Sequence, residues 1–326
     1  MRQLFIAALQ ATLLLAATNA SGQENYPQRA IRLIVPFAPG GASDFTARII
    51  GRVLSEELKQ SIIIDNRGGA AGNIGMEAAA KAAPDGYTIF LGNVGATAIN
   101  PSVFGPTLRV KPEQDFIAVT LVADVPDVLV VNPTVPVATV KEFIDYAAKR
   151  KGELNFATPG SGSQNRLEME HLMKEARISM MHVPYKGGAG PAMIDLLGGQ
   201  TQVMFTTMPS AKGFIKSGQV RALAVTSAQR QADLPTIPTL VEQGYPNMVS
   251  SSWQGIFVPR GTPLPIVNKL FSTLKKVMAQ KAVIDGLAGG GVLSATSASP
   301  EEFAAFLASE TVRWGKVVRE NNITVD

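Results

Sequence analysis

The sequence VPFAPGGASD, residues 35–44, connects an apolar, β-branched run at residues 31–35 to a segment with helical periodicity. Such a run is typical of a strand that is buried in a parallel sheet. Apolar residues then recur at spacings of three and four, which predicts a helix with one buried face. These residues are Phe45, Ile49, Ile50, Val53, Leu54 and Leu58. Residues 31–58 are therefore predicted to form a strand, a turn and a helix.

The turn has the composition of an anion-binding loop. Pro36 and Pro39 stiffen the chain, and Gly40 and Gly41 permit backbone angles that other residues avoid. Ser43 occupies the expected N-cap position, so unpaired N–H groups would point outward at the positive end of the helix dipole. This stretch alone favours a turn that binds nothing, because most glycine-rich turns after strands have no ligand. No phosphate-binding G-x-x-x-x-G-K-[ST] or G-x-G-x-x-G pattern follows a strand, so no nucleotide cofactor is expected.

The rest of the chain repeats the strand-turn-helix plan. Further strands are predicted at residues 62–65, 88–91, 119–122, 128–131, 154–157, 180–183, 203–206, 222–225 and 255–258. The loop at residues 92–97 leaves its strand at the same sheet edge as the first turn, where ligands of open α/β sheets gather. A second turn, TPGSGSQN at residues 158–165, places two glycines and two serines before a helix. Two such turns on two sheets predict a cleft between them.

The predicted fold is therefore α/β, with two domains and a central ligand cleft. We expect a discontinuous first domain at residues 21–124 and 228–326, and a second domain at residues 125–227. Ser299, Pro300 and Glu302 form a strong helix start near the C-terminus. We expect this last helix to pack on the first domain.

Residues 1–20 have the pattern of a cleaved secretory signal peptide. Arg2 supplies the positive region, residues 4–17 form a short apolar core, and Ala20 ends a small-residue cleavage site. The chain has no cysteine, which excludes a lipid-anchor cysteine and disulfides. We therefore expect a periplasmic protein without a lipid anchor. The net charge of +4 is mild and the basic residues are dispersed, so no nucleic-acid partner is expected.

Few residues offer enzyme chemistry. The chain has two histidines, His171 and His182, and no G-x-S-x-G nucleophile motif. Glu168, His171 and Glu175 share one helical face, which could ligate a metal but is more typical of a solvated face. No other cluster has metal-ligand spacing, so neither a metal nor an organic cofactor is expected. Carboxylate-pair chemistry stays open, although nothing in the sequence indicates it.

Several segments together resemble the solute receptors of tripartite tricarboxylate transporters, the Bug family. They are VPFAPGGASD at 35–44, NRGGAAGNIG at 66–75, PDGYT at 84–88, VPYKGG at 183–188, VRALAVTSAQRQADLPTIPT at 220–239 and PRGTP at 259–263. The resemblance extends in order over essentially the whole chain after the predicted signal peptide.

The resemblance implies a monomeric, type II-like periplasmic binding protein with two crossover strands between its domains. Such a receptor closes on a small carboxylate, here a dicarboxylate, a tricarboxylate or an aromatic carboxylate, and delivers it to membrane permease subunits. In this family, backbone N–H groups and ordered water from two facing turns hold the ligand carboxylate. The matching positions here are Phe37, Ala38, Pro39, Gly40, Gly41, Ala42, Ser43 and Asp44 in the first turn, and Gly160, Ser161, Gly162 and Ser163 in the second.

The remaining cleft positions implied by the resemblance are Asn93, Ala96, Thr97, Tyr185, Lys186 and Gly187. Asp44 is expected to tie the turn to its helix, because its charge would repel a carboxylate. Arg166 stands where the family usually has histidine. If its side chain reaches the cleft it would add a carboxylate partner, and if it faces solvent it has no role in binding.

The sequence is also compatible with two other functions. The same cleft would serve a carboxylate sensor that signals through a two-component receptor. An exported hydrolase is the third possibility, and it would have to show turnover.

Overall fold

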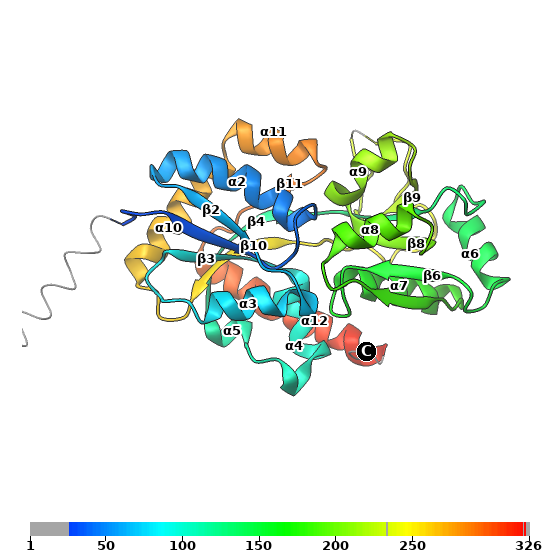
Figure 1. The fold of residues 1–326 in the computed structure, drawn as a ribbon, viewed down its shortest axis with the longest axis horizontal. Coiled ribbons are helices and arrows are strands. Elements are labelled where there is room, and N and C mark those ends of the chain that lie inside the picture. The colour runs from blue at the N-terminus through cyan, green and yellow to red at the C-terminus, as the bar shows by residue number, and fades with distance from the viewer. Residues whose placement is uncertain (1–25, 233, 322, 324–326) are drawn as a thin grey trace, which may run out of the picture.

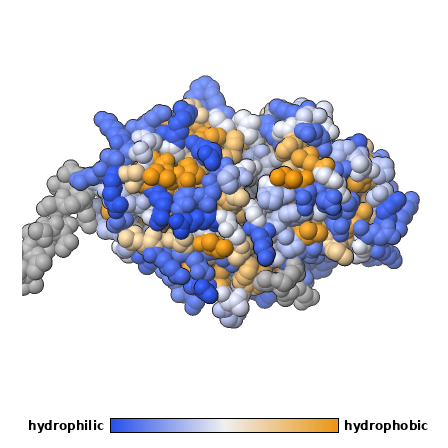
Figure 2. All heavy atoms as spheres, viewed as in Figure 1, coloured by the Kyte–Doolittle hydropathy of each residue, from blue (hydrophilic) through white to orange (hydrophobic). Residues whose placement is uncertain are grey.

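The computed structural model describes residues 26–232, 234–321 and 323, so the predicted signal peptide at 1–20 lies outside the described residues. The chain forms two α/β lobes, each built on its own sheet (Figure 1). Hydrophilic side chains cover most of one face of both lobes, and its apolar areas are small (Figure 2). No helix in the described part is long and apolar enough to cross a membrane.

The first lobe contains a six-stranded sheet. In spatial order its strands are β11 (Leu293–Ser294), β4 (Phe116–Asp124), β10 (Gln254–Pro259), β3 (Thr88–Asn93), β1 (Ile31–Val35) and β2 (Ile62–Asn66). The side chains of β1 alternate between the two cores, with Leu33 and Val35 on one face and Ile34 on the other. This strand is therefore buried on both faces, as its continuous apolar run predicts.

Helices cover both faces of the first sheet. The face that contains Leu33 packs against α2 (Ala42–Leu58), α10 (Leu264–Met278) and α11 (Lys281–Gly289). The opposite face packs against α3 (Asn73–Ala80), the π-helical turn η2 (Gly95–Ile99), α4 (Asn100–Val103) and α12 (Pro300–Glu320). Short turns at η1 (Ala70–Gly72), η3 (Gly105–Thr107) and α5 (Pro112–Asp115) complete the lobe.

The second lobe contains a five-stranded sheet. Its strands in spatial order are β7 (Met181–Pro184), β6 (Asn155–Thr158), β8 (Val203–Thr207), β5 (Asp127–Val131) and β9 (Arg221–Val225). One face packs against α6 (Val140–Ala148) and α7 (Gln164–Ala176), and the other against α8 (Ala189–Leu197) and α9 (Met208–Lys216). Each predicted strand is present, with bounds that differ by at most a few residues.

Each sheet receives one strand directly after the chain crosses from the other lobe. β5 follows the first crossing and runs antiparallel to β8 and β9. β10 follows the second crossing and runs antiparallel to β3 and β4. The predicted two-domain fold with two crossover strands is confirmed by this topology.

The two crossings lie side by side and form the connection between the lobes, which we call the hinge. Val125 and Pro126 make the first crossing, and the N–H of Ser252 in the second crossing donates to the Val125 carbonyl at 2.8 Å. Leu240 and Met248 pack in the core of the second sheet, and the N–H of Leu240 bonds to the end of β9. The chain therefore returns to the first lobe near residue 250, later than the boundary predicted at 228. The physical reason is that apolar residues after β9 still find their core on the second sheet.

The C-terminal helix α12 packs on the first lobe, as expected from its sequence. The Ser299 side chain accepts the N–H of Glu302, and Pro300 is the first helical residue. Phe303 is fully buried, and its ring centroid lies 5.1 Å from that of Phe257 and 6.1 Å from that of Trp253. This contact fixes α12 against β10 at the end of the second crossing.

Replacing Phe303 with alanine removes a buried ring from this contact. We expect a loss of about 3–5 kcal/mol in the free energy of unfolding, because the ring leaves a cavity among rigid aromatic neighbours. Val312→Ala on the same helix is the control, since Val312 is 73% exposed. Urea unfolding of both variants measures the difference, and similar losses for the two would contradict this packing role.

Candidate functional site

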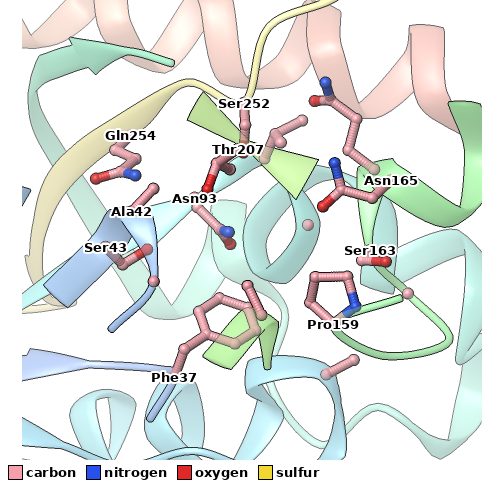
Figure 3. Close-up of a pocket in the computed structure, with 17 residues that line it drawn as sticks. Phe37, Ala42, Ser43, Asn93, Pro159, Ser163, Asn165, Thr207, Ser252 and Gln254 are labelled. Atoms are coloured by element: carbon pink, nitrogen blue, oxygen red, sulfur yellow. The ribbon is translucent and has the colours of Figure 1, made fainter. Parts of the chain in front are cut away.

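A cavity lies between the two lobes at the ends of the parallel strands (Figure 3). It contains about 560 Å³ of space not occupied by atoms, part of which is open to solvent. None of the described residues that line it carries a charge. The lining residues are Phe37, Gly41, Ala42, Ser43, Ala71, Asn93, Val94, Gly95, Pro159, Gly162, Ser163, Gln164, Asn165, Ala189, Thr207, Ser252 and Gln254.

The first wall is the N-terminus of α2. Gly41, not the predicted Ser43, is the N-cap, and it provides no side chain to the first-turn N–H groups. Ser43 lies inside the first turn, because the helix begins two residues earlier than its sequence pattern predicts. Gly40 has φ +95°, a left-handed angle that favours glycine, so the bend falls here. The first-turn amides of α2 therefore face the cavity without a capping group.

Asp44 fixes this turn from behind. Its carboxylate accepts the N–H of Gly40 at 3.2 Å and the guanidinium of Arg48 at 3.0 Å. Asp44 is buried and does not line the cavity. This arrangement agrees with the expectation that Asp44 ties the turn to its helix.

The second wall is the N-terminus of α7, on the other lobe. Ser163 is its N-cap, and the hydroxyl oxygen accepts the N–H of Arg166. The hydroxyl hydrogen of Ser163 is therefore free to donate to a ligand. Gln164 and Asn165 follow in the first helical turn and also line the cavity. The positive ends of two helices, one from each lobe, thus face the same space.

A third turn supports the cavity between these walls. The Asn93 side-chain oxygen accepts the N–H of Ala96 at 3.0 Å, and its backbone carbonyl accepts the Thr97 hydroxyl at 2.8 Å. The amide nitrogen of Asn93 is left to face the cavity, and Figure 3 shows the amide pointing toward Phe37 and Asn165. Ala96 and Thr97 are fully buried and hold this turn without lining the cavity.

The two lobes touch around the cavity, so the structure is closed. The N–H of Ala38 donates to the Gly187 carbonyl across the cleft at 3.3 Å. A Cβ atom on Gly162 would lie 1.9 Å from Oδ1 of Asn100 in the first lobe. Lys212 of α9 donates to the carbonyls of Ala288 and Gly289 at the C-terminal end of α11. These contacts depend on the relative position of the lobes.

Two buried acids lie behind the second wall. Asp127 begins β5 directly after the first crossing, and Glu168 lies on α7. Burial raises the pKa of Asp127 well above its ordinary value, and the charge of Glu168 raises it further. Burial also raises the pKa of Glu168, while hydrogen bonds from Ser250, Gln164 and Asn165 oppose that shift. The prediction that Glu168 lies on a solvent-exposed face is wrong, because its side chain is buried against the hinge, where it accepts a hydrogen bond from Ser250.

The structure separates the predicted site residues into two groups. Those that line the cavity are Phe37, Gly41, Ala42, Ser43, Asn93, Gly162 and Ser163. Those that lie near it without lining it are Ala38, Pro39, Gly40, Asp44, Ala96, Thr97, Gly160, Ser161, Arg166, Tyr185, Lys186 and Gly187. Several of the second group hold the backbone of the first.

Arg166 and the turn after β7, which contains Tyr185 and Lys186, do not line the cavity. Arg166 is buried, and its guanidinium donates to the Ser161 carbonyl at 3.3 Å, so it neither reaches the cavity nor faces solvent. The Tyr185 hydroxyl donates to Asp195 at 2.6 Å, and burial together with this bond raises its pKa. Lys186 is exposed.

Sequence reasoning missed ten lining residues. Gln164 and Asn165 directly follow the second predicted turn, and their place in the first helical turn was the available signal. Thr207, Ser252 and Gln254 come from strand ends and the hinge, where nothing local marks them. The others are Ala71, Val94, Gly95, Pro159 and Ala189.

A family model described as "Tripartite tricarboxylate transporter family receptor" matches residues 46–323. The chain belongs to this family. Protein BugT of Bordetella pertussis is 39% identical over 299 residues, which cover 91% of this chain and 90% of BugT. A solved R. palustris structure with adipate has a TM-score of 0.88 at 35% identity and covers 92% of this chain and 100% of its own. MatC from Rhodopseudomonas palustris with bound malate has a TM-score of 0.84 at 32% identity, covering 90% and 100%.

Members of this receptor family are solute-binding proteins and not enzymes, in agreement with the scarcity of catalytic groups in the sequence. The helical face considered as a metal site also has another explanation. His171 Nε2 lies 3.3 Å from the Glu175 carboxylate, and Glu168 points away into the hinge. Among the described residues, no group of three or more such side chains is placed to hold a metal ion.

The buried acids give this receptor a specific pH dependence. The folded-state pKa values of Asp127 and Glu168 lie above those of the unfolded chain, so the folded protein holds extra protons above about pH 4. Their contribution to the free energy of unfolding therefore falls as the pH rises through the folded pKa values. Asp127→Asn removes one titrating group, and we expect a smaller fall than in the wild type.

Thermal unfolding at a series of pH values measures this effect. Asp285→Asn is the control, because the Asp285 side chain is exposed on α11. An Asp127→Asn curve that runs parallel to the wild-type curve over the whole series would contradict the assignment.

Proposed function

We propose that this receptor captures a small carboxylate between its lobes and delivers it to the membrane subunits of a tripartite tricarboxylate transporter. The observation that carries the proposal is that the N-termini of α2 and α7 face one uncharged cavity from opposite lobes. A carboxylate would accept hydrogen bonds from both helices at once and so favour closure. The relatives solved with adipate and malate support this class of ligand.

Simple energetics indicate that these groups are sufficient. Each hydrogen bond to a charged group contributes about 1.5–3 kcal/mol, and a helix N-terminus adds about 0.3–1 kcal/mol. About four such bonds, reduced by the free-energy cost of association, leave roughly −8 kcal/mol, which corresponds to a micromolar Kd. No lysine or arginine is required in the cavity. Asn93 and Ser163 supply side-chain donors in addition to the helix N–H groups.

Delivery follows from the proposed capture. In the closed structure Lys212 of α9 contacts the end of α11, and we expect the open receptor to lack this joint surface. Membrane subunits that recognise this surface would select loaded receptor. Uptake of the ligand by vesicles that contain the membrane subunits, with and without the receptor, tests this step.

Gly162→Ala tests capture by closure. The φ angle of Gly162 is not in the left-handed region, so the backbone accepts alanine, but the added methyl would meet Asn100 of the other lobe. We expect carboxylate affinity to fall about tenfold or more, because overpacking costs about 1–3 kcal/mol. Calorimetric titration with the tightest acid from a thermal-shift screen of carboxylates measures the change.

Two variants serve as controls for this test. Gly213→Ala adds the same methyl on α9, where no heavy atom lies within 4 Å. Lys186→Ala removes an exposed cation outside the cavity, and we expect no change for either. If folded Gly162→Ala binds normally while Lys186→Ala abolishes binding, a salt bridge carries recognition and the proposal is wrong.

We also propose that residues 1–20 are a signal peptide that directs export and is removed after Ala20. The charged start, the short apolar core and the absence of cysteine support this proposal. N-terminal sequencing of the protein from the periplasm should start at Ser21 or within two residues of it. An exported protein that retains Met1 would contradict cleavage.

A further inference from the structure

The side-chain amides of Gln164 and Asn165 have a fixed orientation. Gln164 Nε2 donates to Asp127 Oδ2 at 2.9 Å and to Glu168 Oε1 at 2.8 Å. Asn165 Nδ2 donates to Asp127 Oδ1 at 2.9 Å and to Glu168 Oε2 at 3.2 Å. Each NH₂ group thus uses both of its hydrogens on the acids behind the wall. Carboxylates accept and do not donate when ionised, so the opposite orientation of the amides is disfavoured.

This orientation leaves amide oxygens as the free groups of the wall. Gln164 Oε1 is buried and has no hydrogen-bond partner in the described structure. Figure 3 shows the oxygen of Asn165 directed toward the middle of the cavity and its nitrogen directed away. Gln254 is fully buried at the same cavity, and neither its oxygen nor its nitrogen has a partner. A buried acceptor without a partner is costly, and a donor group on a bound ligand would supply the missing hydrogen bond.

The electrostatic field at this wall favours a donor over a second anion. Asp127 and Glu168 are both buried, and both accept hydrogen bonds from the side-chain amides of Gln164 and Asn165. Asp124 at the end of β4 adds a further acidic group. Arg166, although on the same helix, points to the Ser161 carbonyl. None of the described residues that line the cavity offers a cation to a second carboxylate.

We infer that the ligand carries a hydrogen-bond donor, an ammonium or a hydroxyl group, that faces the amide oxygens of Gln164 and Asn165. This inference rests on the proposed function, since the carboxylate of the same ligand occupies the helix N-termini. Glu168 and Asp127 act as positioning residues that hold the amides in the accepting orientation. Ser250 of the second crossing donates to Glu168, so the same acids join the wall to the hinge.

Matched acids test the inference on the wild-type receptor. Calorimetry would compare propionate with lactate and alanine, and succinate with malate and aspartate, at one pH and ionic strength. Within each set the carbon chain is the same and one hydrogen becomes a hydroxyl or an ammonium group, so the hydroxyl member adds a donor without adding a charge. We expect the acids with a donor to bind about tenfold more tightly or better, because the acids without one leave buried acceptors unpaired. The hydroxyl and ammonium members of each set show which donor the wall prefers.

Variants then assign the preference to the wall. Glu168→Gln removes the charge that orients the amides, and Gln164→Met removes an accepting oxygen at nearly constant size. We expect the affinity ratio between acids with and without a donor to fall toward one in both variants. Glu175→Gln, the same change on α7 beside His171, should leave the ratio unchanged. A purely structural role of Glu168 would lower all affinities together and leave the ratio intact.

The possible outcomes separate this inference from the proposed function. If none of the acids binds, carboxylate capture fails and the inference fails with it. If acids with and without a donor bind equally to the wild type, capture stands and the donor requirement is wrong. Circular dichroism and thermal unfolding check that the variants fold, and if Glu168→Gln does not, Gln164→Met decides the result.

Discussion

In the proposed site, the N–H groups at the start of α2 and α7 can bind one anion together only when the two lobes are closed. Each helix alone is an ordinary helix end, and each belongs to a separate sheet with its own core. Closure places both positive ends at a single cavity whose lining is uncharged. Contacts between the lobes depend on this approach: a Cβ atom on Gly162 would meet the Asn100 side chain, and the N–H of Ala38 donates to the Gly187 carbonyl.

The hinge and the binding wall share one set of side chains. Asp127 starts the strand after the first crossing, and the Thr226 hydroxyl at the end of the second sheet accepts its N–H. The Glu168 carboxylate accepts hydrogen bonds from the Ser250 hydroxyl of the second crossing and from the side-chain amides of Gln164 and Asn165 in the wall. A buried pair of acids is costly unless its hydrogen-bonding capacity is filled. Here the partners come from the second crossing and from α7, and Asp127 itself follows the first crossing, so the position of the wall depends on the position of the hinge.

Arg166 and Asp44 allow the family resemblance to be compared with the structure. Arg166 was a predicted cleft position, where its charge would add a carboxylate partner only if the side chain reached the ligand. In the structure its guanidinium instead donates to the Ser161 carbonyl, and its Nε lies 3.7 Å from the Glu170 carboxylate. Asp44, by contrast, has the structural role expected from its charge. A charged residue close to a predicted site in sequence is therefore informative only once its own partners are known.

The sequence by itself determined the local elements and the family. Continuous apolar runs indicated strands buried on both faces, and Ser299 with Glu302 indicated the start of α12, because burial and capping follow periodicity and short-range hydrogen bonds. The two turns before α2 and α7 were also predicted from glycine, proline and serine. Their exact caps were not, since Gly41 ends the first turn without any side-chain signal.

Only the tertiary structure decided which of these elements meet. Gln254 reaches the cavity because β10 pairs with β3 after a crossing of the hinge, and it lies opposite Asn93, more than 150 positions earlier in the chain. Glu168 is buried because α7 packs against that same hinge. The physical reason is that periodicity reports the burial of a residue against its own sheet, whereas a site between two lobes depends on contacts that form only when the chain crosses and the lobes close.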